Sequence, residues 1–261
     1  MSDALLRIEH VSKTFDLGKG NAIKAVEDVS FAVTNGSICV LLGPSGSGKS
    51  TILRMIAGLE TQSEGRITLK DRAVAGPGQD RGMVFQAYTS FDWLSVRKNV
   101  EFGMKINGVP EKERRDRAEH FIRLVGLAKF IDTYPTRLSG GMRQRVAIAR
   151  TLANDPEVLL MDEPFGALDA ETRWQMQELM VDLADASGTT LIIVTHDIEE
   201  AIFLADKIVF LSSHPGRLKQ EIILDFKPAS RIRDKEQMLA LPAYGAMERK
   251  IMRLMREEGN H

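Results

Sequence analysis

The stretch from Gly43 to Thr51 reads GPSGSGKST, and it constrains the fold of this 261-residue chain more than any other feature. It fits the pattern G-x-x-x-x-G-K-S/T and directly follows the apolar run Ile38–Leu42, which predicts a buried strand. A helix is expected from Ser50 to Ala57, ending at Gly58. A strand, a glycine-rich turn and a helix in this order form the context of a phosphate-binding loop.

Glycines in such a loop allow successive backbone N–H groups to point at phosphate oxygens, and the helix N-terminus adds positive partial charge. Lys49 is expected to reach the β- and γ-phosphates, and the Ser50 hydroxyl is expected to ligate Mg²⁺. A chance glycine-rich turn is the alternative, and the flanking strand and helix argue against it. The predicted phosphate-binding residues are Gly43, Pro44, Ser45, Gly46, Ser47, Gly48, Lys49, Ser50 and Thr51.

Two adjacent carboxylates follow another apolar run. Val158–Met161 predicts a buried strand, and Asp162 and Glu163 stand at its end. Asp162 can hold Mg²⁺ as the aspartate of a P-loop ATPase does, and Glu163 can orient or deprotonate an attacking water. An acidic turn at a strand end is common by itself, so the pair gains its meaning from the phosphate-binding loop.

A second glycine-containing helix start lies at Leu138–Gly141, which reads LSGG. Ser139 is a good N-cap, and Gly140 and Gly141 expose backbone N–H groups, so this helix start can also bind phosphate. From these residues alone, a plain capped helix running on to Leu152 remains the alternative.

The remaining apolar patterns predict an α/β core. Leu191–Val194 suits a parallel strand buried on both faces, and Ile208–Leu211 is expected to join it. Helical patterns lie between these runs. Pro110 followed by two glutamates predicts one helix start, and an amphipathic helix is expected after Asp169.

The two ends of the chain carry different patterns. Alternating apolar and polar residues over about the first 40 residues predict short antiparallel strands. Near the other end, a strand is expected at Glu221–Phe226. A final helix carries an apolar stripe that indicates core packing rather than a partner surface, made of Met247, Ile251, Leu254 and Met255.

Together these patterns predict a single domain over residues 1–261. We expect a β subdomain and core at about 1–40 and 65–85, a helical subdomain at about 88–155, more core at about 156–230, and a C-terminal helical tail at about 231–261.

Composition excludes several classes of partner. Lys and Arg total 35 against 36 Asp and Glu, a net charge of −1, so no overall basic field is available for nucleic acid or an anionic bilayer. The longest apolar runs are strand-sized and fall short of the ~20 residues that span a bilayer, so any membrane function needs another chain. The single cysteine, Cys39, lies in an apolar run, where a buried hydrophobic residue in a reducing cytosol is expected.

The phosphate-binding loop, LSGG, the acidic pair and a lone histidine after a strand, in this order, resemble the ABC (ATP-binding-cassette) ATPases. The resemblance covers nearly the whole chain, and LSGG distinguishes this family from other P-loop NTPases. It implies an α/β fold, namely a P-loop NTPase (RecA-like) ABC ATPase core with an N-terminal antiparallel β subdomain and an inserted α-helical subdomain.

The resemblance also implies roles for single residues. Gln86 would sense Mg²⁺ and the attacking water, His196 would contact the γ-phosphate, Asp169 would act across a dimer interface, and Phe15 would stack on adenine. Without the resemblance, His196 and Phe15 would be interpreted as structural. Met142 stands where glutamine is commonest, and Phe15 where tyrosine is commonest; both are compatible, because the signature contacts come from Ser139 and glycine amides and a phenyl ring still stacks.

The predicted catalytic residues are thus Glu163, His196, Lys49 and Gln86, and the predicted Mg²⁺ ligands are Ser50, Gln86 and Asp162. Because each phosphate-binding element occurs once, the resemblance implies a head-to-tail homodimer with two ATP molecules at its interface. It further implies integral membrane permease subunits, a solute-binding protein acting through the complex, and a peripheral position on the cytoplasmic face of the cell membrane. No nucleic-acid partner is expected.

Three stretches resemble importer subunits of the nitrate/sulfonate/taurine branch: residues 76–86, 92–100 and 211–217. The resemblance therefore implies ATP-driven import of a small molecule through a separate permease. The alternatives are an ATPase of a multi-subunit exporter, a soluble ABC ATPase acting on DNA or ribosomes, and a regulator that binds ATP without hydrolysing it. An intact Glu163 and His196 argue against the last of these.

The segment Ala87–Leu94 follows Gln86 and contains Tyr88, Phe91 and Trp93. In the family, the membrane subunit is gripped in this region, and aromatic side chains suit a docking surface. A local mini-core for the helical insertion explains the same aromatics equally well.

Overall fold

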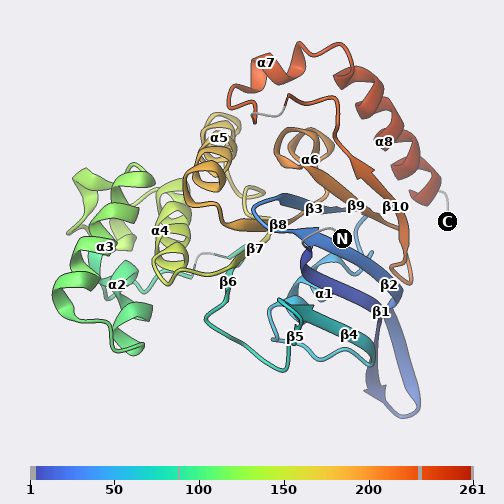
Figure 1. The fold of residues 1–261 in the computed structure, drawn as a ribbon, viewed down its shortest axis with the longest axis horizontal. Coiled ribbons are helices and arrows are strands. Elements are labelled where there is room, and N and C mark those ends of the chain that lie inside the picture. Colours follow the sequence, from blue (N-terminus) through green and yellow to red (C-terminus); the bar gives the residue numbers. More distant parts are fainter. Residues whose placement is uncertain (1–3, 88, 229–230, 260–261) are drawn as a thin grey trace.

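The computed structural model describes residues 4–87, 89–228 and 231–259, and within these ranges ten strands form two sheets (Figure 1). The larger sheet has the strand order β10-β9-β3-β8-β7-β6. Its strands are β3 (Ile38–Leu42), β6 (Arg81–Val84), β7 (Val158–Asp162), β8 (Thr190–Thr195), β9 (Lys207–Leu211) and β10 (Leu218–Ile223). All neighbours are parallel except β10, which pairs antiparallel with β9. The predicted α/β class is confirmed.

Side chains of the parallel strands alternate between two hydrophobic cores. In β3, Ile38 and Val40 face a core shared with the helices that follow β6 in the chain. Cys39 and Leu41 face a second core, which is shared with α1 (Lys49–Ile56) and the smaller sheet. Burial on both faces explains the near-continuous apolar runs of these strands. Cys39 is buried as expected, and desolvation raises the pKa of its thiol to about 12.

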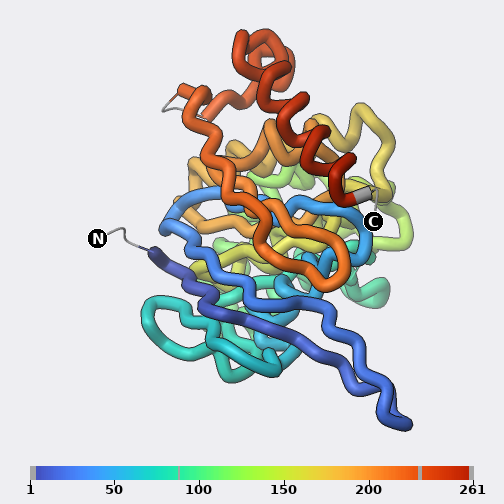
Figure 2. Tube along the Cα trace, turned by 90° about the vertical axis from the view of Figure 1, so that its right-hand side faces the viewer, coloured from blue at the N-terminus to red at the C-terminus, as the bar shows by residue number. Residues whose placement is uncertain are grey.

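The smaller sheet is antiparallel, with the order β2-β1-β4-β5. Its strands are β1 (Ala4–Gly18), β2 (Asn21–Thr34), β4 (Glu64–Leu69) and β5 (Arg72–Ala73). The prediction of short strands at the N-terminus was wrong, because β1 and β2 form one long hairpin that projects beyond the rest of the molecule (Figure 2). Only the base of the hairpin is buried. The strand pairing continues through several bulges into an exposed part that carries Leu17 and Ile23. In that part the sequence no longer alternates between apolar and polar residues, so the pattern does not show that the strands continue.

A helical insertion occupies one end of the molecule (Figure 1). It contains α2 (Val96–Ile106), α3 (Glu111–Leu124) and α4 (Gly140–Leu152), with short 3-10 turns at Ala128–Phe130 and Pro135–Arg137. The start of α3 is confirmed, since Pro110 is its N-cap and two glutamates stand in its first turn. Its Ala118 and Ile122 are buried against the rest of the insertion.

The C-terminal half adds α5 (Ala170–Ser187), α6 (Ile198–Leu204), α7 (Lys235–Leu239) and α8 (Tyr244–Gly259). The last strand lies at Leu218–Ile223 rather than at Glu221–Phe226. The N–H of Leu224 still bonds the carbonyl oxygen of Asp206, one step beyond the Ile223–Lys207 pair, and the chain then turns away, with the N–H of Lys227 bonding the carbonyl oxygen of Leu224. On α8, Ile251 is buried and the rest of the predicted stripe packs against the core, so core packing is confirmed. Within the described ranges, no helix has the length and apolarity needed to cross a membrane.

Gly58 ends α1 as expected and adopts a positive φ of 73°. A Cβ atom at Gly58 would lie 2.2 Å from the carbonyl group of Gly76, whereas Gly188, which ends α5 at φ 64°, has open space at that position. We therefore expect Gly58→Ala to lower the free energy of unfolding by about 2 to 4 kcal/mol, against about 1 kcal/mol for Gly188→Ala. Urea unfolding measures both, and equal losses would contradict a steric role for the contact with Gly76.

Candidate functional site

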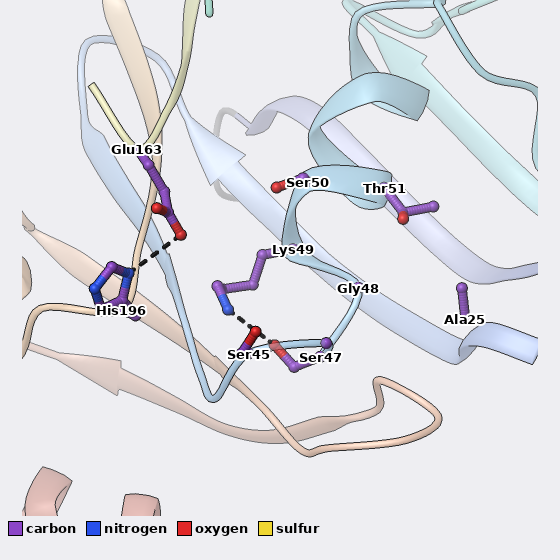
Figure 3. A pocket seen from close by; sticks show the side chains of 10 residues that line it. Ala25, Ser45, Ser47, Gly48, Lys49, Ser50, Thr51, Glu163 and His196 are labelled. Atoms are coloured by element: carbon purple, nitrogen blue, oxygen red, sulfur yellow. Dashed lines mark hydrogen bonds and ion pairs between the residues drawn. The ribbon is translucent and has the colours of Figure 1, made fainter. Parts of the chain in front are cut away.

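The phosphate-binding loop connects β3 to α1 and forms one wall of a cavity of about 580 Å³ (Figure 3). Gly48 is the N-cap of α1 with φ 75°, and a Cβ atom there would lie 2.8 Å from the carbonyl oxygen of Ala25. Glycine is therefore required for the turn to lie this close to β2. The cavity is lined by Ala25, Ser45, Gly46, Ser47, Gly48, Lys49, Ser50, Thr51, Glu163 and His196.

Lys49 provides the cationic group of this cavity. Its ammonium donates to the carbonyl oxygens of Gly43 at 2.8 Å and Pro44 at 2.7 Å, and to the Ser47 hydroxyl at 3.2 Å. Burial lowers the pKa of Lys49, and the nearby charges of Glu163 and Asp162 oppose that shift. A partly desolvated cation beside the N-terminus of α1 suits a polyphosphate.

Ser50 and Asp162 lie together as the sequence predicted. The Ser50 hydroxyl donates to Oδ1 of Asp162 at 2.7 Å, which joins the first turn of α1 to the end of β7. Hydroxyl and carboxylate oxygens are ligands that Mg²⁺ prefers, and Mg²⁺ in nucleotide sites takes few protein ligands with phosphates completing its shell. No cluster of three or more His, Cys, Asp or Glu in the described part of the chain could hold a metal by itself. The donor set therefore fits Mg²⁺ bound together with a nucleotide.

Glu163 is the centre of a polar group opposite Lys49 (Figure 3). Its Oε2 accepts a hydrogen bond from Nε2 of Gln86 at 3.3 Å, and its Oε1 lies 3.2 Å from Nδ1 of His196. Glu163 has a φ of 43°, a conformation that non-glycine residues rarely adopt and that is enriched at active sites. Three residues predicted for catalysis thus meet at one point beside the fourth, Lys49.

The LSGG helix start lies on the helical insertion, away from the residues that line this cavity. Ser139 caps α4 by accepting from the N–H of Met142 at 3.3 Å, and Asp169 caps α5 by accepting from the N–H of Thr172 at 3.0 Å. That hydrogen bond holds the pKa of Asp169 below its usual range. A Cβ atom at Gly141 would lie 2.4 Å from the Thr172 side chain, so the two helix starts pack directly together, with Gly140 beside them.

Phe15 lies on the projecting hairpin, where it pairs with Ile23 across the two strands. It is not among the residues that line the cavity. Its ring is partly buried, and the ammonium of Lys13 lies 4.8 Å from the ring centroid while also bonding Glu60 at 2.6 Å. Sequence reasoning missed two neighbours of the phosphate-binding loop, Ala25 and His214. A Cβ atom at Gly46 would lie 2.7 Å from the His214 ring, a contact that no local pattern signals.

Comparison with known proteins identifies the chain's family. The family model described as "ABC transporter" matches residues 26–166. The chain belongs to the ABC transporter family. It is 47% identical to the nitrate import ATP-binding protein NrtD of Synechocystis sp. over 84% of this chain and 82% of that protein. It is 45% identical to the taurine import ATP-binding protein TauB of Rhizobium johnstonii over 96% of each.

Among solved structures, a dimeric ATP-binding cassette in a post-hydrolysis state bound to ADP and Pi is similar, with a TM-score of 0.74 and 32% identity. The match covers 84% of this chain and 98% of that chain. The prediction of an ABC ATPase that couples ATP hydrolysis to transport is confirmed.

A buried polar chain joins α5, α6 and α7 in this ABC ATPase. Glu200, on α6, accepts from Nε2 of Gln177 on α5 at 3.4 Å, and Oε1 of Gln177 accepts from the ammonium of Lys235 at 3.1 Å. All three side chains are buried. Desolvation, aided by the charge of Asp197, raises the pKa of Glu200 to about 8.

This raised pKa predicts a pH dependence of stability. The folded protein keeps a proton on Glu200 that the unfolded chain, with an ordinary value of 4.5, releases. Glu200 therefore costs no stability below pH 4.5, and its cost grows as pH rises from 4.5 toward about 8. Glu200→Gln cannot ionise, so we expect its melting temperature to fall less than that of the wild type between about pH 5 and pH 8. Calorimetry measures both melting temperatures, and an equal change with pH in the two proteins would contradict the raised pKa of Glu200.

Proposed function

We propose that this chain is the ATP-hydrolysing subunit of a membrane importer and energises import of a small molecule such as nitrate, a sulfonate or taurine through a separate permease. The observation that carries the proposal is the meeting of Gln86, Glu163 and His196 opposite Lys49. The similar nitrate and taurine import proteins support the importer branch.

Binding of ATP is assigned to the loop from Gly43 to Thr51. Its amides and Lys49 hold the phosphates, and Ser50 and Asp162, with Gln86 nearby, would hold Mg²⁺, which supplies positive charge to the phosphate oxygens. Phe15, on the adjacent hairpin, is assigned to stacking on adenine.

Hydrolysis is assigned to the group around Glu163. Its carboxylate receives a proton from the attacking water, Gln86 orients that water, and His196 donates toward the γ-phosphate. Lys49 stabilises the negative charge that develops on the transferred phosphoryl group.

A head-to-tail homodimer would complete the site. Ser139, Gly140 and Gly141 lie apart from the cavity of their own chain, so a second copy would place them on the ATP held at Lys49. Asp169 packs beside that helix start and would face the same interface. The dimeric cassette with a similar fold supports this arrangement.

The permease is proposed to bind the helical insertion from the cytoplasmic face, with a solute-binding protein acting through the complex. Phe91, Trp93, Phe102 and Ile106 form an aromatic patch there, in which Trp93 is 73% and Ile106 70% exposed. Tyr88, expected to contribute, lies outside the described residues. Exposed aromatic and aliphatic side chains in one patch suit a protein partner better than solvent.

Glu163→Gln removes the proton acceptor but keeps the shape of the side chain. We expect ATP turnover to fall by about 100-fold or more, while ATP binding is retained. Steady-state phosphate release and equilibrium ATP binding measure the two effects. Turnover near that of the wild type would remove Glu163 from the role of base.

Lys49→Ala is the matched control, because it removes the cation from the opposite wall of the cavity. It should lose ATP binding itself. Unchanged ATP affinity in this variant would contradict the assignment of the phosphate-binding loop.

Purification of the tagged protein from its native membranes in mild detergent tests the importer. We expect a multi-span permease and a solute-binding protein to accompany it, and the binding protein can then be titrated with nitrate, taurine and other sulfonates. A permease without a binding protein would favour an exporter. Recovery with ribosomes, DNA or no partner would contradict transport while leaving the ATPase assignment intact.

A further inference from the structure

One short segment joins the catalytic group to the aromatic patch. Gln86, at its start, contacts Glu163 at 3.3 Å, and Trp93, near its end, is largely exposed. We call residues Thr89–Ser95 the docking loop. It has no regular secondary structure before α2 begins at Val96, so side chains from elsewhere must fix its shape.

Asn99, on α2, fixes one side of the docking loop. It is fully buried, and its Oδ1 accepts from the N–H of Phe91 at 2.7 Å. Its Nδ2 donates to the carbonyl oxygens of Phe91 at 3.0 Å, Leu94 at 2.9 Å and Ser95 at 3.1 Å. A buried amide with these partners holds the loop in one conformation, because every alternative leaves polar groups unpaired.

Arg150 fixes the other side from the last turn of α4. Its two terminal nitrogens donate to the carbonyl oxygen of Thr89 at 2.8 Å and to the Thr89 hydroxyl at 2.7 Å. The guanidinium also lies 5.0 Å from the ring centroid of Phe91, a cation–π contact. Burial lowers the pKa of Arg150, which reflects the desolvation of this cation.

The loop also packs through its aromatic side chains. The Phe91 ring is 4.5 Å from Phe102 on α2 and 5.3 Å from Trp93, centroid to centroid. Phe91 is therefore the inner, mini-core member of the patch, and Trp93 is its outer, accessible member. Phe91 thus fits the mini-core interpretation, and Trp93 has the exposure that the docking interpretation requires.

We propose that Arg150 is a positioning residue that makes the docking loop and α4 move as one body, while Asn99 on α2 holds the loop in shape. The proposal rests on the proposed function, because the loop is the assigned docking site for the permease. Since α4 begins at the LSGG motif, a force applied at Trp93 is transmitted to Ser139 through the Arg150–Thr89 contact and the helix axis. Permease contact would thereby set the position of the signature on the ATP of the second copy.

The chain's two tryptophans make the loop directly observable. In a Trp174→Phe background, Trp93 is the single reporter. We expect Arg150→Met to lower the fluorescence anisotropy of Trp93, because the docking loop gains mobility when a bidentate charge-assisted contact is lost. Arg150→Lys keeps a positive charge near the Phe91 ring but cannot make both hydrogen bonds to Thr89, so the order of the docking loop should be intermediate between that of the wild type and that of Arg150→Met.

Two further variants guard against misfolding as an explanation. Thr89→Val removes the hydroxyl partner while leaving Arg150 and its carbonyl contact in place, and it should give a smaller change of the same sign. Arg123→Met, at an exposed position on α3, should leave Trp93 unchanged. Unchanged anisotropy of Trp93 in Arg150→Met, or an equal loss of anisotropy in Arg123→Met, would overturn the proposal.

The complete importer, purified with its permease and solute-binding protein, tests the coupling. We expect Arg150→Met to reduce the stimulation of ATP hydrolysis by solute-loaded binding protein by about tenfold or more, and Arg150→Lys to recover part of it. If Arg150→Met is stimulated as strongly as the wild type, the positioning role of Arg150 is overturned while the proposed function stands. If the wild-type chain captures no permease, the proposed function fails, and the coupling role falls with it.

Discussion

The parallel pairing of four neighbouring strands is the constraint on which the site depends. In the order β3-β8-β7-β6, the strands end in step, with Leu42 opposite Thr195, Asp162 opposite Val194 and Val84 opposite Met161. The residues that follow each strand are therefore neighbours along one edge of the sheet. The phosphate-binding loop, His196, the acidic pair and Gln86 meet because of this register, although up to 153 residues separate Gly43 from His196 along the chain.

The two helix starts that are predicted to bind phosphate lie in different parts of the molecule, the sheet core and the helical insertion. The start of α1 is packed into the sheet and closed by β2, whereas the start of α4 is packed against α5 on the insertion. Each is held by contacts that glycine alone permits, at Gly48 and at Gly141. The proposed ATP site, which uses one helix start from each of two copies, would therefore be assembled from both parts of the molecule. The docking loop follows Gln86 in the chain and is held by α2 and α4 of the helical insertion.

Sequence patterns located the ends of the strands, whereas the role expected of His196 came only from the family resemblance. Lys49, Asp162 and His196 stand directly after or near the ends of apolar runs, and such runs locate a sheet edge without knowledge of the rest of the fold. The projecting half of the β1–β2 hairpin could not be found in this way, because its side chains face solvent on both sides. Asn99 and Arg150 were missed for another reason, because neither of them belongs to a motif. Arg150 also bonds Thr89, which lies 61 residues away along the chain.

The positive φ of Glu163 has a consequence for how the chain tolerates change. A φ of 43° costs most side chains a backbone strain of order 1 to 3 kcal/mol, which glycine would relieve. The backbone conformation that holds the proposed base beside Gln86 and His196 therefore lowers stability, in the manner of a stability–activity trade-off. Searches for thermostable variants made without an assay for ATP turnover would favour glycine at position 163 and so remove the proposed base.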